Sequence, residues 1–173
     1  MIEAAKYSAI ETLRDGQPIE IRALRPDDRA GLLAAVARSS DQSLRRRFFA
    51  AKRSFSDNEI DYFLDIDFID HVALVAALNE AGRTTIVGGG RYVLVQPGTA
   101  EVAFAVVDEF HGQGIGAALM RHLVAIARDA GLDTLIAEVL ADNSPMLKVF
   151  EKSGLPCSTK RDAGVVHVSL ALT

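Results

Sequence analysis

The chain has 173 residues, 49% of them hydrophobic and 24% charged, which predicts one folded domain and excludes a disordered or low-complexity chain. Its 19 basic and 23 acidic side chains leave a net charge of −4, which argues against a general nucleic-acid-binding protein. The single cysteine, Cys157, excludes an internal disulfide bond and a multi-cysteine zinc site, and it favours a reducing compartment. Since the sequence has neither a signal-peptide pattern nor an apolar run long enough to span a membrane, we expect a soluble, cytoplasmic protein.

The N-terminal third is predicted to hold a hairpin followed by three short helices. Residues 12–24 are expected to form two strands, because an Asp-Gly turn divides them. A Pro-Asp-Asp sequence predicts a helix from residue 26, and a second short helix is expected to end near residue 48. Ser56 and Glu59 have the spacing of a capping box, which predicts the third helix.

From residue 71 the pattern changes to apolar, β-branched runs, which predict an antiparallel meander. We expect four strands joined by short turns, one of them at the three consecutive glycines, over residues 71–78, 84–88, 91–95 and 100–107. An amphipathic helix is then predicted from residue 115 until Gly131, followed by a strand, a helix and a strand over residues 135–140, 144–154 and 165–172. This order predicts an α/β (α+β) domain with a mixed sheet.

The most informative segment, residues 106–118, has three alternating glycines where a strand ends and a long helix begins. Positions without side chains let phosphates approach the backbone, and the first amides and the dipole of a helix favour anions. The alternative is an ordinary strand-to-helix turn whose glycines serve the backbone geometry alone. A Walker loop is excluded, because Gly116 is followed by two alanines rather than by Lys-Ser or Lys-Thr.

A dinucleotide-binding loop is the competing interpretation of this segment. Gly112, Gly114 and Ala117 satisfy the pattern G-x-G-x-x-A, and Glu138 follows at about the distance expected for a ribose-binding carboxylate. However, that loop normally opens a parallel sheet, whereas an antiparallel meander precedes it here. Glu138 also lies inside its predicted strand rather than at the strand end. We therefore keep dinucleotide binding as the less favoured alternative.

Residues 111–116, His-Gly-Gln-Gly-Ile-Gly, resemble the signature Gln/Arg-x-x-Gly-x-Gly/Ala of the GNAT family of acyl-CoA-dependent N-acetyltransferases. Residues 143–155 are similar to a second family element, an Asn leading into a helix that ends Lys-x-Gly-Phe. The predicted order of elements matches from about Ile19 to the C-terminus. The segments 13–16, 21–28 and 43–49 further resemble the GNAT domain of bacterial protein lysine acetyltransferases.

The resemblance implies a single GNAT domain over residues 1–173, with an N-terminal extension at about 1–18 and a mixed, mostly antiparallel sheet flanked by helices. It implies transfer of an acetyl group from acetyl-CoA to a primary amine, with a protein lysine as the favoured acceptor and no metal ion. A small-molecule amine remains an alternative acceptor. A non-catalytic acyl-CoA-binding regulatory module remains an alternative from another class.

Glu101 is the candidate catalytic base. Strand alternation places it with Ala103 and Ala105, opposite Phe104, in a strand that is otherwise apolar. A positioned carboxylate is a natural base for an amine that is protonated at neutral pH, and GNAT enzymes that resemble this chain use a strand glutamate about this far before the glycine loop. The alternative is an ordinary solvent-exposed carboxylate.

The resemblance assigns acetyl-CoA binding to the end of the same strand, to the glycine loop and to two residues further on: Phe104, Ala105, Val106, Val107, His111, Gly112, Gln113, Gly114, Ile115, Gly116, Ala117, Asn143 and Phe150. His111 departs from the family's Gln or Arg, and Leu155 departs from its Phe. Phe150 stands where many GNAT enzymes have a tyrosine general acid, and it cannot donate a proton. Asn143 before Ser-Pro is equally consistent with helix capping.

Two charged segments are interpreted as solvated surface. Arg45–Arg47 could attract an acidic acceptor, but a charge run on a helix is usually a solvated face. The acidic residues between positions 59 and 70 could attract a cationic amine, although exposed helix ends predict the same residue types.

Overall fold

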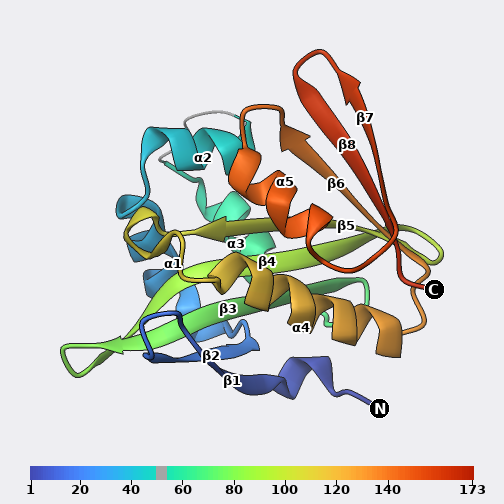
Figure 1. Cartoon of the computed structure of the whole chain (residues 1–173). Helices are drawn as coiled ribbons and strands as arrows, with labels where there is room; N and C mark the ends of the chain where they lie inside the picture. The colour runs from blue at the N-terminus through green and yellow to red at the C-terminus, as the bar shows by residue number, and fades with distance from the viewer. Residues whose placement is uncertain (50–53) are drawn as a thin grey trace.

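The computed structural model describes residues 1–49 and 54–173 and contains an eight-stranded sheet in the order β1-β2-β3-β4-β5-β6-β8-β7 (Figure 1). All neighbouring strands are antiparallel except β5 and β6, which pair in parallel. The predicted mixed, mostly antiparallel sheet is therefore confirmed. The strands are β1 (Ser8–Thr12), β2 (Pro18–Ala23), β3 (His71–Glu80), β4 (Arg83–Gln96), β5 (Thr99–Val106), β6 (Thr134–Leu140), β7 (Cys157–Asp162) and β8 (Val165–Ala171).

Helices cover both faces of this sheet, with α4 and α5 on one face and α1, α2 and α3 on the other (Figure 1). Alternate residues of β3 show the division: Val72 and Leu74 belong to the core shared with α4, whereas Ala73 and Val75 pack with residues of α1 and α3. The helices are α1 (Arg29–Ala37), α2 (Asp41–Phe48), α3 (Asp57–Leu64), α4 (Ile115–Asp129) and α5 (Ser144–Glu151). The predicted capping box is present at α3, where Ser56 and Glu59 exchange side-chain-to-backbone hydrogen bonds of 3.1 Å.

The predicted N-terminal hairpin is confirmed as β1 and β2, and its first strand begins at Ser8. Residues expected to lie in an extension thus pair within the sheet. Glu11 of β1 accepts hydrogen bonds from Arg121 at 2.9 Å and from His122 at 2.7 Å, both on α4. These two bonds hold the pKa of the Glu11 carboxyl below its usual value, with Arg121 the larger influence. The hairpin is therefore tied to the central helix by charge as well as by backbone pairing.

The prediction of a turn at Gly88–Gly90 is wrong, because these residues lie in the middle of the 14-residue strand β4. The glycines serve close packing instead. Gly90 lies opposite Phe104 in the β4–β5 register, and a Cβ on Gly90 would lie 2.6 Å from Phe104 Cδ1 and 3.1 Å from Leu123 Cδ1. The missing side chain lets the Phe104 ring and α4 lie directly against the strand.

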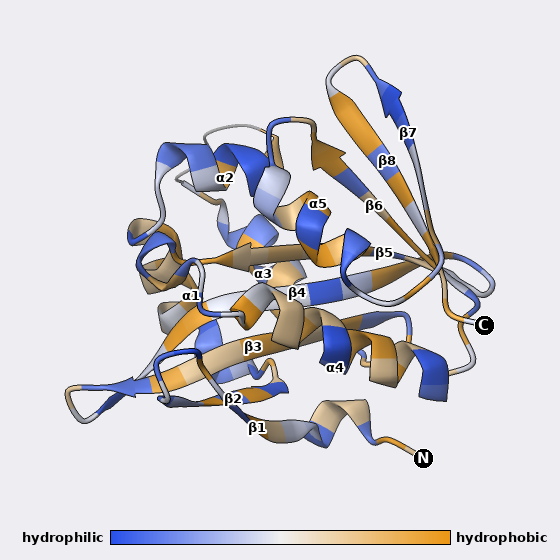
Figure 2. Ribbon diagram, in the orientation of Figure 1, coloured by the Kyte–Doolittle hydropathy of each residue, from blue (hydrophilic) through white to orange (hydrophobic). Residues whose placement is uncertain are grey.

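Sequence analysis also missed β7, the last strand of the sheet at the β8 edge. All six of its residues are exposed, so it has no apolar alternation to reveal it. In Figure 2, β7 is mostly hydrophilic, whereas its neighbour β8 alternates between hydrophobic and hydrophilic residues. Only pairing with β8 makes this segment a strand.

A Gly90→Ala substitution should destabilise the protein by roughly 1–3 kcal/mol, because the buried ring of Phe104 must shift to admit the new methyl group. Gly89→Ala is the matched control, since its Cβ would meet only Leu74 O at 3.5 Å, an ordinary contact. The control should change the free energy of unfolding, measured by urea denaturation, by no more than about 0.5 kcal/mol. Equal losses in the two variants would contradict the packing role of Gly90.

Candidate active site

The parallel strands β5 and β6 part shortly after they meet. Their pairing covers only Thr99–Glu101 against Thr134–Ile136, although β5 continues to Val106 and β6 to Leu140. Figure 1 shows the two strands diverging from this junction, with α5 beside the gap. Backbone N–H and C=O groups along a gap of this kind need partners, and an extended ligand can supply them in the manner of an added strand.

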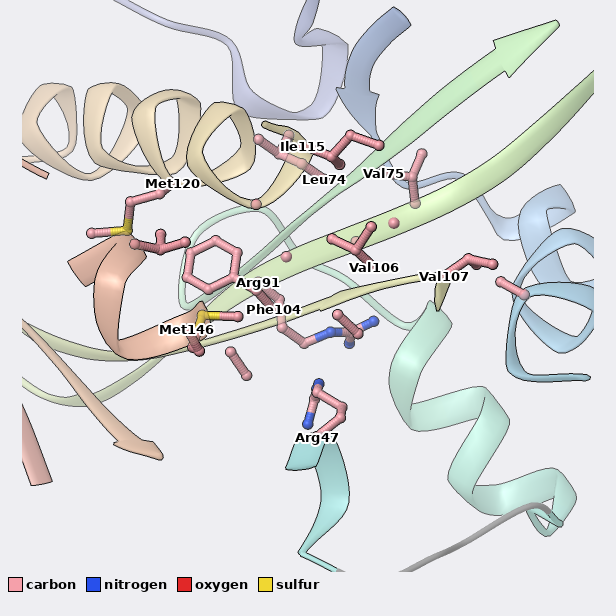
Figure 3. A pocket seen from close by; sticks show the side chains of 18 of the residues that line it. Arg47, Leu74, Val75, Arg91, Phe104, Val106, Val107, Ile115, Met120 and Met146 are labelled. Atoms are coloured by element: carbon pink, nitrogen blue, oxygen red, sulfur yellow. The ribbon is translucent and has the colours of Figure 1, made fainter. Parts of the chain in front are cut away.

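A cavity of about 890 Å³ fills the gap and reaches both faces of the sheet. Its walls include Met120 of α4 and Met146 of α5 on one side, and Phe48 of α2 and Phe63 of α3 on the other. Figure 3 shows Phe104 and Met146 close together in this cavity, with Arg47 approaching from α2. The volume is in the usual range for a small-molecule or cofactor site. The cavity therefore connects the α4–α5 face with the α1–α3 face.

The glycine loop forms one end of the cavity. Gly112 has φ +79° and Gly114 has φ +89°, and these left-handed conformations favour glycine strongly. Residues 115–117 in the first turn of α4 line the cavity, and amides in the first turn of a helix have no partner within the helix. This end presents N–H groups and the positive end of a helix dipole, which fits a phosphate-bearing cofactor.

The structure brings most of the predicted cofactor-binding residues together. The cavity is lined by the strand end, the glycine loop and the cap of α5: Phe104, Ala105, Val106, Val107, His111, Gly112, Gly114, Ile115, Gly116, Ala117 and Asn143. Gln113 does not line it. Phe150 is buried against Phe104, with ring centroids 6.1 Å apart, and lines a small cavity of about 30 Å³ within the strand gap. Their contacts with the cofactor stay a prediction.

Hydrogen bonds fix the shape of the loop. The His111 ring donates from Nε2 to the Val106 carbonyl oxygen at 2.8 Å, which links the loop to the end of β5. Asn143 Oδ1 accepts from the Met146 N–H at 3.3 Å, so Asn143 caps α5 as well as lining the cavity. Arg14 donates to the Gly112 carbonyl oxygen at 3.0 Å and also lines the cavity. Sequence analysis missed Arg14, because no local pattern reports a contact between residues 98 positions apart.

Glu101 lies outside this lining. It is exposed at the last paired position of β5, opposite Val93 of β4 and Ile136 of β6. An exposed carboxylate pays little desolvation cost, so its place in an apolar strand no longer argues for a function. Alternation puts it on the same face as Ala103, which lines the cavity, and its charge acts on Arg47 of α2. Glu101 thus marks the junction where the strands part, on the α2 side.

The interpretation of Arg45–Arg47 as a solvated face is wrong for Arg47. Arg45 does form a surface ion pair with Asp142, but Arg47 lines the cavity, where burial lowers the pKa of its guanidinium. Arg91 of β4 lines it as well, and burial together with the charge of Arg47 lowers the pKa of Arg91 to about 10. Helix periodicity places residue 47 on a different side of α2 from residue 45, which turns it toward the sheet.

His71 lies beside this pair of arginines. The Arg91 Nη1 donates to His71 Nε2 at 3.1 Å, which requires an unprotonated ring nitrogen. Burial, followed by the charge of Arg91, lowers the pKa of His71 to about 4. The imidazole is therefore neutral near pH 7 and serves as a hydrogen-bond acceptor for the arginine.

A model of the acetyltransferase (GNAT) family matches residues 41–155. The chain belongs to this family. It is 33% identical over 138 residues to the Pseudomonas aeruginosa acetyltransferase PA5475, and this match covers 79% of this chain and 74% of the relative. It is 30% identical over 156 residues to the acetyltransferase Pat of Mycolicibacterium smegmatis, with 89% of this chain covered but only 46% of the relative. The chain thus spans about half the length of that second protein.

Solved structures agree with the family assignment. The GNAT domain of PAT from Streptomyces lividans superposes with a TM-score of 0.85, at 34% identity, and the match covers 95% of this chain and 96% of that one. The Salmonella typhimurium acetyltransferase yncA, determined with its cofactor acetyl-CoA, shares the fold with a TM-score of 0.73 at 16% identity, over 90% and 94% of the two chains. The protein is an acetyl-CoA-dependent N-acetyltransferase. The glycine loop is therefore assigned to acetyl-CoA rather than to a dinucleotide.

Neither a membrane-spanning helix nor a metal site is found in the part of the chain that the structure describes. None of its helices is long and apolar enough to cross a bilayer. The described His, Cys, Asp and Glu side chains form no group of three or more that could hold a metal ion.

The glycine loop predicts a specific loss of CoA binding in Gly116→Val. A Cβ at this helical position would lie 3.6 Å from Val149 Cγ2, so a methyl group fits, but the two further carbons of valine would crowd the cavity wall that Gly116 and Val149 both line. CoA affinity, measured by calorimetry, should fall at least roughly tenfold, or about 1.4 kcal/mol. Gly116→Ala is the control and should bind CoA nearly as the native protein does. Unchanged affinity in a folded Gly116→Val variant would remove the loop from the CoA site.

His71 predicts a defined acid sensitivity. The unfolded chain takes up a proton on this ring near pH 6.5, whereas the folded protein does so only near pH 4. Between these values the unfolded state binds more protons, so stability falls as the pH falls, by up to about 3 kcal/mol from this group. His71→Gln should flatten the dependence of unfolding free energy on pH in this window. Parallel pH profiles of the two proteins would contradict the buried, neutral state of His71.

Proposed function

We propose that this acetyltransferase modifies the ε-amine of lysine residues in proteins. The observation that carries the proposal is the place of the three segments that resemble bacterial protein lysine acetyltransferases. Residues 13–16, 21–28 and 43–49 all contribute to the cavity wall, the first through Arg14, the second through Leu24 and the third through Ser43 and Phe48. The resemblance therefore concerns the surroundings of the site rather than the sheet alone. The similarity to the Streptomyces PAT domain over nearly the whole chain also supports it.

The cofactor supplies an acetyl thioester that is already activated toward amines. The protein must hold the thioester in the strand gap, admit the amine from the α1–α3 face and remove a proton from it. Residues 104–107, at and just beyond the end of β5, line the cavity, and so do residues 115–117 in the first turn of α4. Proximity and orientation of this kind account for a large part of catalysis in a two-substrate reaction.

Glu101 is proposed as the group that takes the proton, directly or through a water molecule. It lies on the α2 face at the junction of the strand gap, and its exposure gives it access to water. Phe150 has no proton to donate and is buried against Phe104, so we propose that the departing thiolate is protonated by solvent rather than by residue 150. The single cysteine and the use of acetyl-CoA support a cytoplasmic location, which is part of the same proposal.

The deciding experiment presents purified protein and acetyl-CoA with proteins from a bacterial lysate and, separately, with small amines. Immunodetection of acetyl-lysine on proteins, together with CoA release, is the expected result. CoA release with small amines alone would assign the enzyme to a small-molecule acceptor.

Glu101→Gln keeps the shape and most hydrogen bonding of the side chain but removes the base. Turnover should fall roughly 10²–10⁴-fold while CoA affinity stays nearly unchanged. Glu20→Gln is the control, because Glu20 is also a strand glutamate but lies on β2, three strands away from β5 and the strand gap. Near-native turnover of Glu101→Gln at neutral pH would show that another group, or bulk water, accepts the proton.

A further inference from the structure

Arg47 and Arg91 reach the same cavity from different elements. Arg47 lies on α2, which packs against β5, and Arg91 lies opposite Ala103 in the β4–β5 register. Figure 3 shows both guanidinium groups in the cavity, on the side toward α2 and α3. This side lies across the sheet from the glycine loop and α4. The two cations thus stand where the amine acceptor is proposed to enter.

Neither guanidinium has an acidic partner among the residues that the structure describes. Arg91 donates to the Phe63 carbonyl oxygen at 3.2 Å and to neutral His71 at 3.1 Å, and it lies over the Phe63 ring. Arg47 lies 4.8 Å from the centroid of the Phe48 ring. Glu101 is attracted to Arg47 but forms no ion pair with it. Residues 50–53 are Ala-Ala-Lys-Arg and carry no carboxylate.

Other arginines of this chain do have an aspartate as their partner. The buried Arg22 forms a bidentate pair with Asp28, through two hydrogen bonds of 2.8 Å. On α2 itself, Arg45 forms an ion pair with Asp142, and Arg46 donates to the Asp142 carbonyl oxygen at 2.9 Å. On the α2 side of the cavity, Arg47 and Arg91 therefore differ from these three arginines, because neither forms an ion pair or hydrogen bond with a carboxylate of the described chain.

Two partly buried like charges without an ion-paired carboxylate are unfavourable. Burial lowers the pKa of both guanidinium groups, and the charge of Arg47 lowers the pKa of Arg91 further, whereas Glu101 opposes the lowering at Arg47. Buried charges in folded proteins are normally paired, and a planar guanidinium matches a carboxylate through two parallel hydrogen bonds. An acceptor that brought only a cationic amine to this place would be repelled. An acceptor with a carboxylate near its amine would supply the pairing that the two guanidinium groups lack.

We propose that Arg47 and Arg91 form a carboxylate-binding subsite that selects amine acceptors carrying an acidic group close to the reactive amine. The inference rests on the proposed function, since it takes the acceptor to enter from the α2 face. For a protein lysine the acidic group is an aspartate or glutamate beside it in the folded or extended substrate. A carboxylate on the acyl group, as in succinyl-CoA, has the same chemistry, and the experiment separates the two sources.

The test uses two synthetic peptides with one lysine, flanked by aspartate in one and by asparagine in the other. With acetyl-CoA, the native enzyme should show a KM for the aspartate peptide that is roughly ten- to a hundredfold lower. Arg47→Gln and Arg91→Gln should abolish this preference, and Arg47→Lys should restore part of it. Arg45→Gln is the matched control, because Arg45 is on the same helix but does not line the cavity, and it should keep the preference.

Equal KM values for the two peptides in the native enzyme would overturn the proposal. A preference for succinyl-CoA over acetyl-CoA that disappears in the arginine variants, with both peptides alike, would overturn the acceptor assignment and give the subsite to the acyl group. Thermal denaturation and CoA binding of each variant show that a lost preference does not come from unfolding.

Equilibrium binding separates this inference from the proposed function. Each peptide is titrated into the complex of the protein with CoA, in which no acetyl group is transferred. Tighter binding of the aspartate peptide, dependent on both arginines, supports the subsite even if neither peptide is acetylated. Equal binding of the two peptides overturns it, whatever the lysate experiment shows.

Discussion

The short parallel contact between β5 and β6 is the constraint on which the site depends. Pairing stops at Glu101 and Ile136, so backbone groups beyond it are available in a gap that would be closed in a fully paired sheet. The rest of the fold supports this gap. Gly90 lets Phe104 lie flat against β4, Phe150 of α5 packs on the Phe104 ring, and α4 follows β5 through a loop that turns at Gly112 and Gly114. On one side of the gap β1 to β5 are paired in sequence order, and on the other side β6, β8 and β7 are paired. The gap therefore lies between two sets of paired strands.

The gap is electropositive at both ends although the protein has a net charge of −4. At the α4 end the positive potential comes from helix amides and suits the phosphates of the cofactor. At the α2 end it comes from Arg47 and Arg91, which carry whole charges and contact neutral or aromatic groups rather than an ion-paired carboxylate of the described chain. Between them lie apolar side chains such as Phe104 and Met146. Positive charge concentrated in the cavity of a protein with a net negative charge favours the approach of anionic groups to the site.

Most elements of the fold could be predicted, because their signals are local. The capping box at Ser56, the Asp-Gly hairpin turn and the amphipathic pattern of α4 each depend on residues within a few positions of one another. The failures share a cause. The glycines of β4 look like a turn in the sequence, but they are needed for the close packing of Phe104 on the strand. β7 has no hydrophobic pattern of its own and is a strand only because it pairs with β8. In both cases a distant segment decided the local conformation.

The sequence by itself determined the family and the cofactor end of the site, since the glycine loop is contiguous and its chemistry is carried by backbone conformation. It also identified Glu101 as a candidate base. One argument for that choice was the cost of placing a charge in an apolar strand, and this argument does not apply because the Glu101 side chain is exposed. Only the tertiary structure decided the acceptor end. Arg47 is one of three consecutive arginines: Arg45 and Arg46 bind Asp142, whereas Arg47 lines the cavity without a carboxylate partner in the described chain. Which arginine meets Arg91 depends on how α2 packs across β5, and packing between segments far apart in the chain leaves no signature in either segment alone.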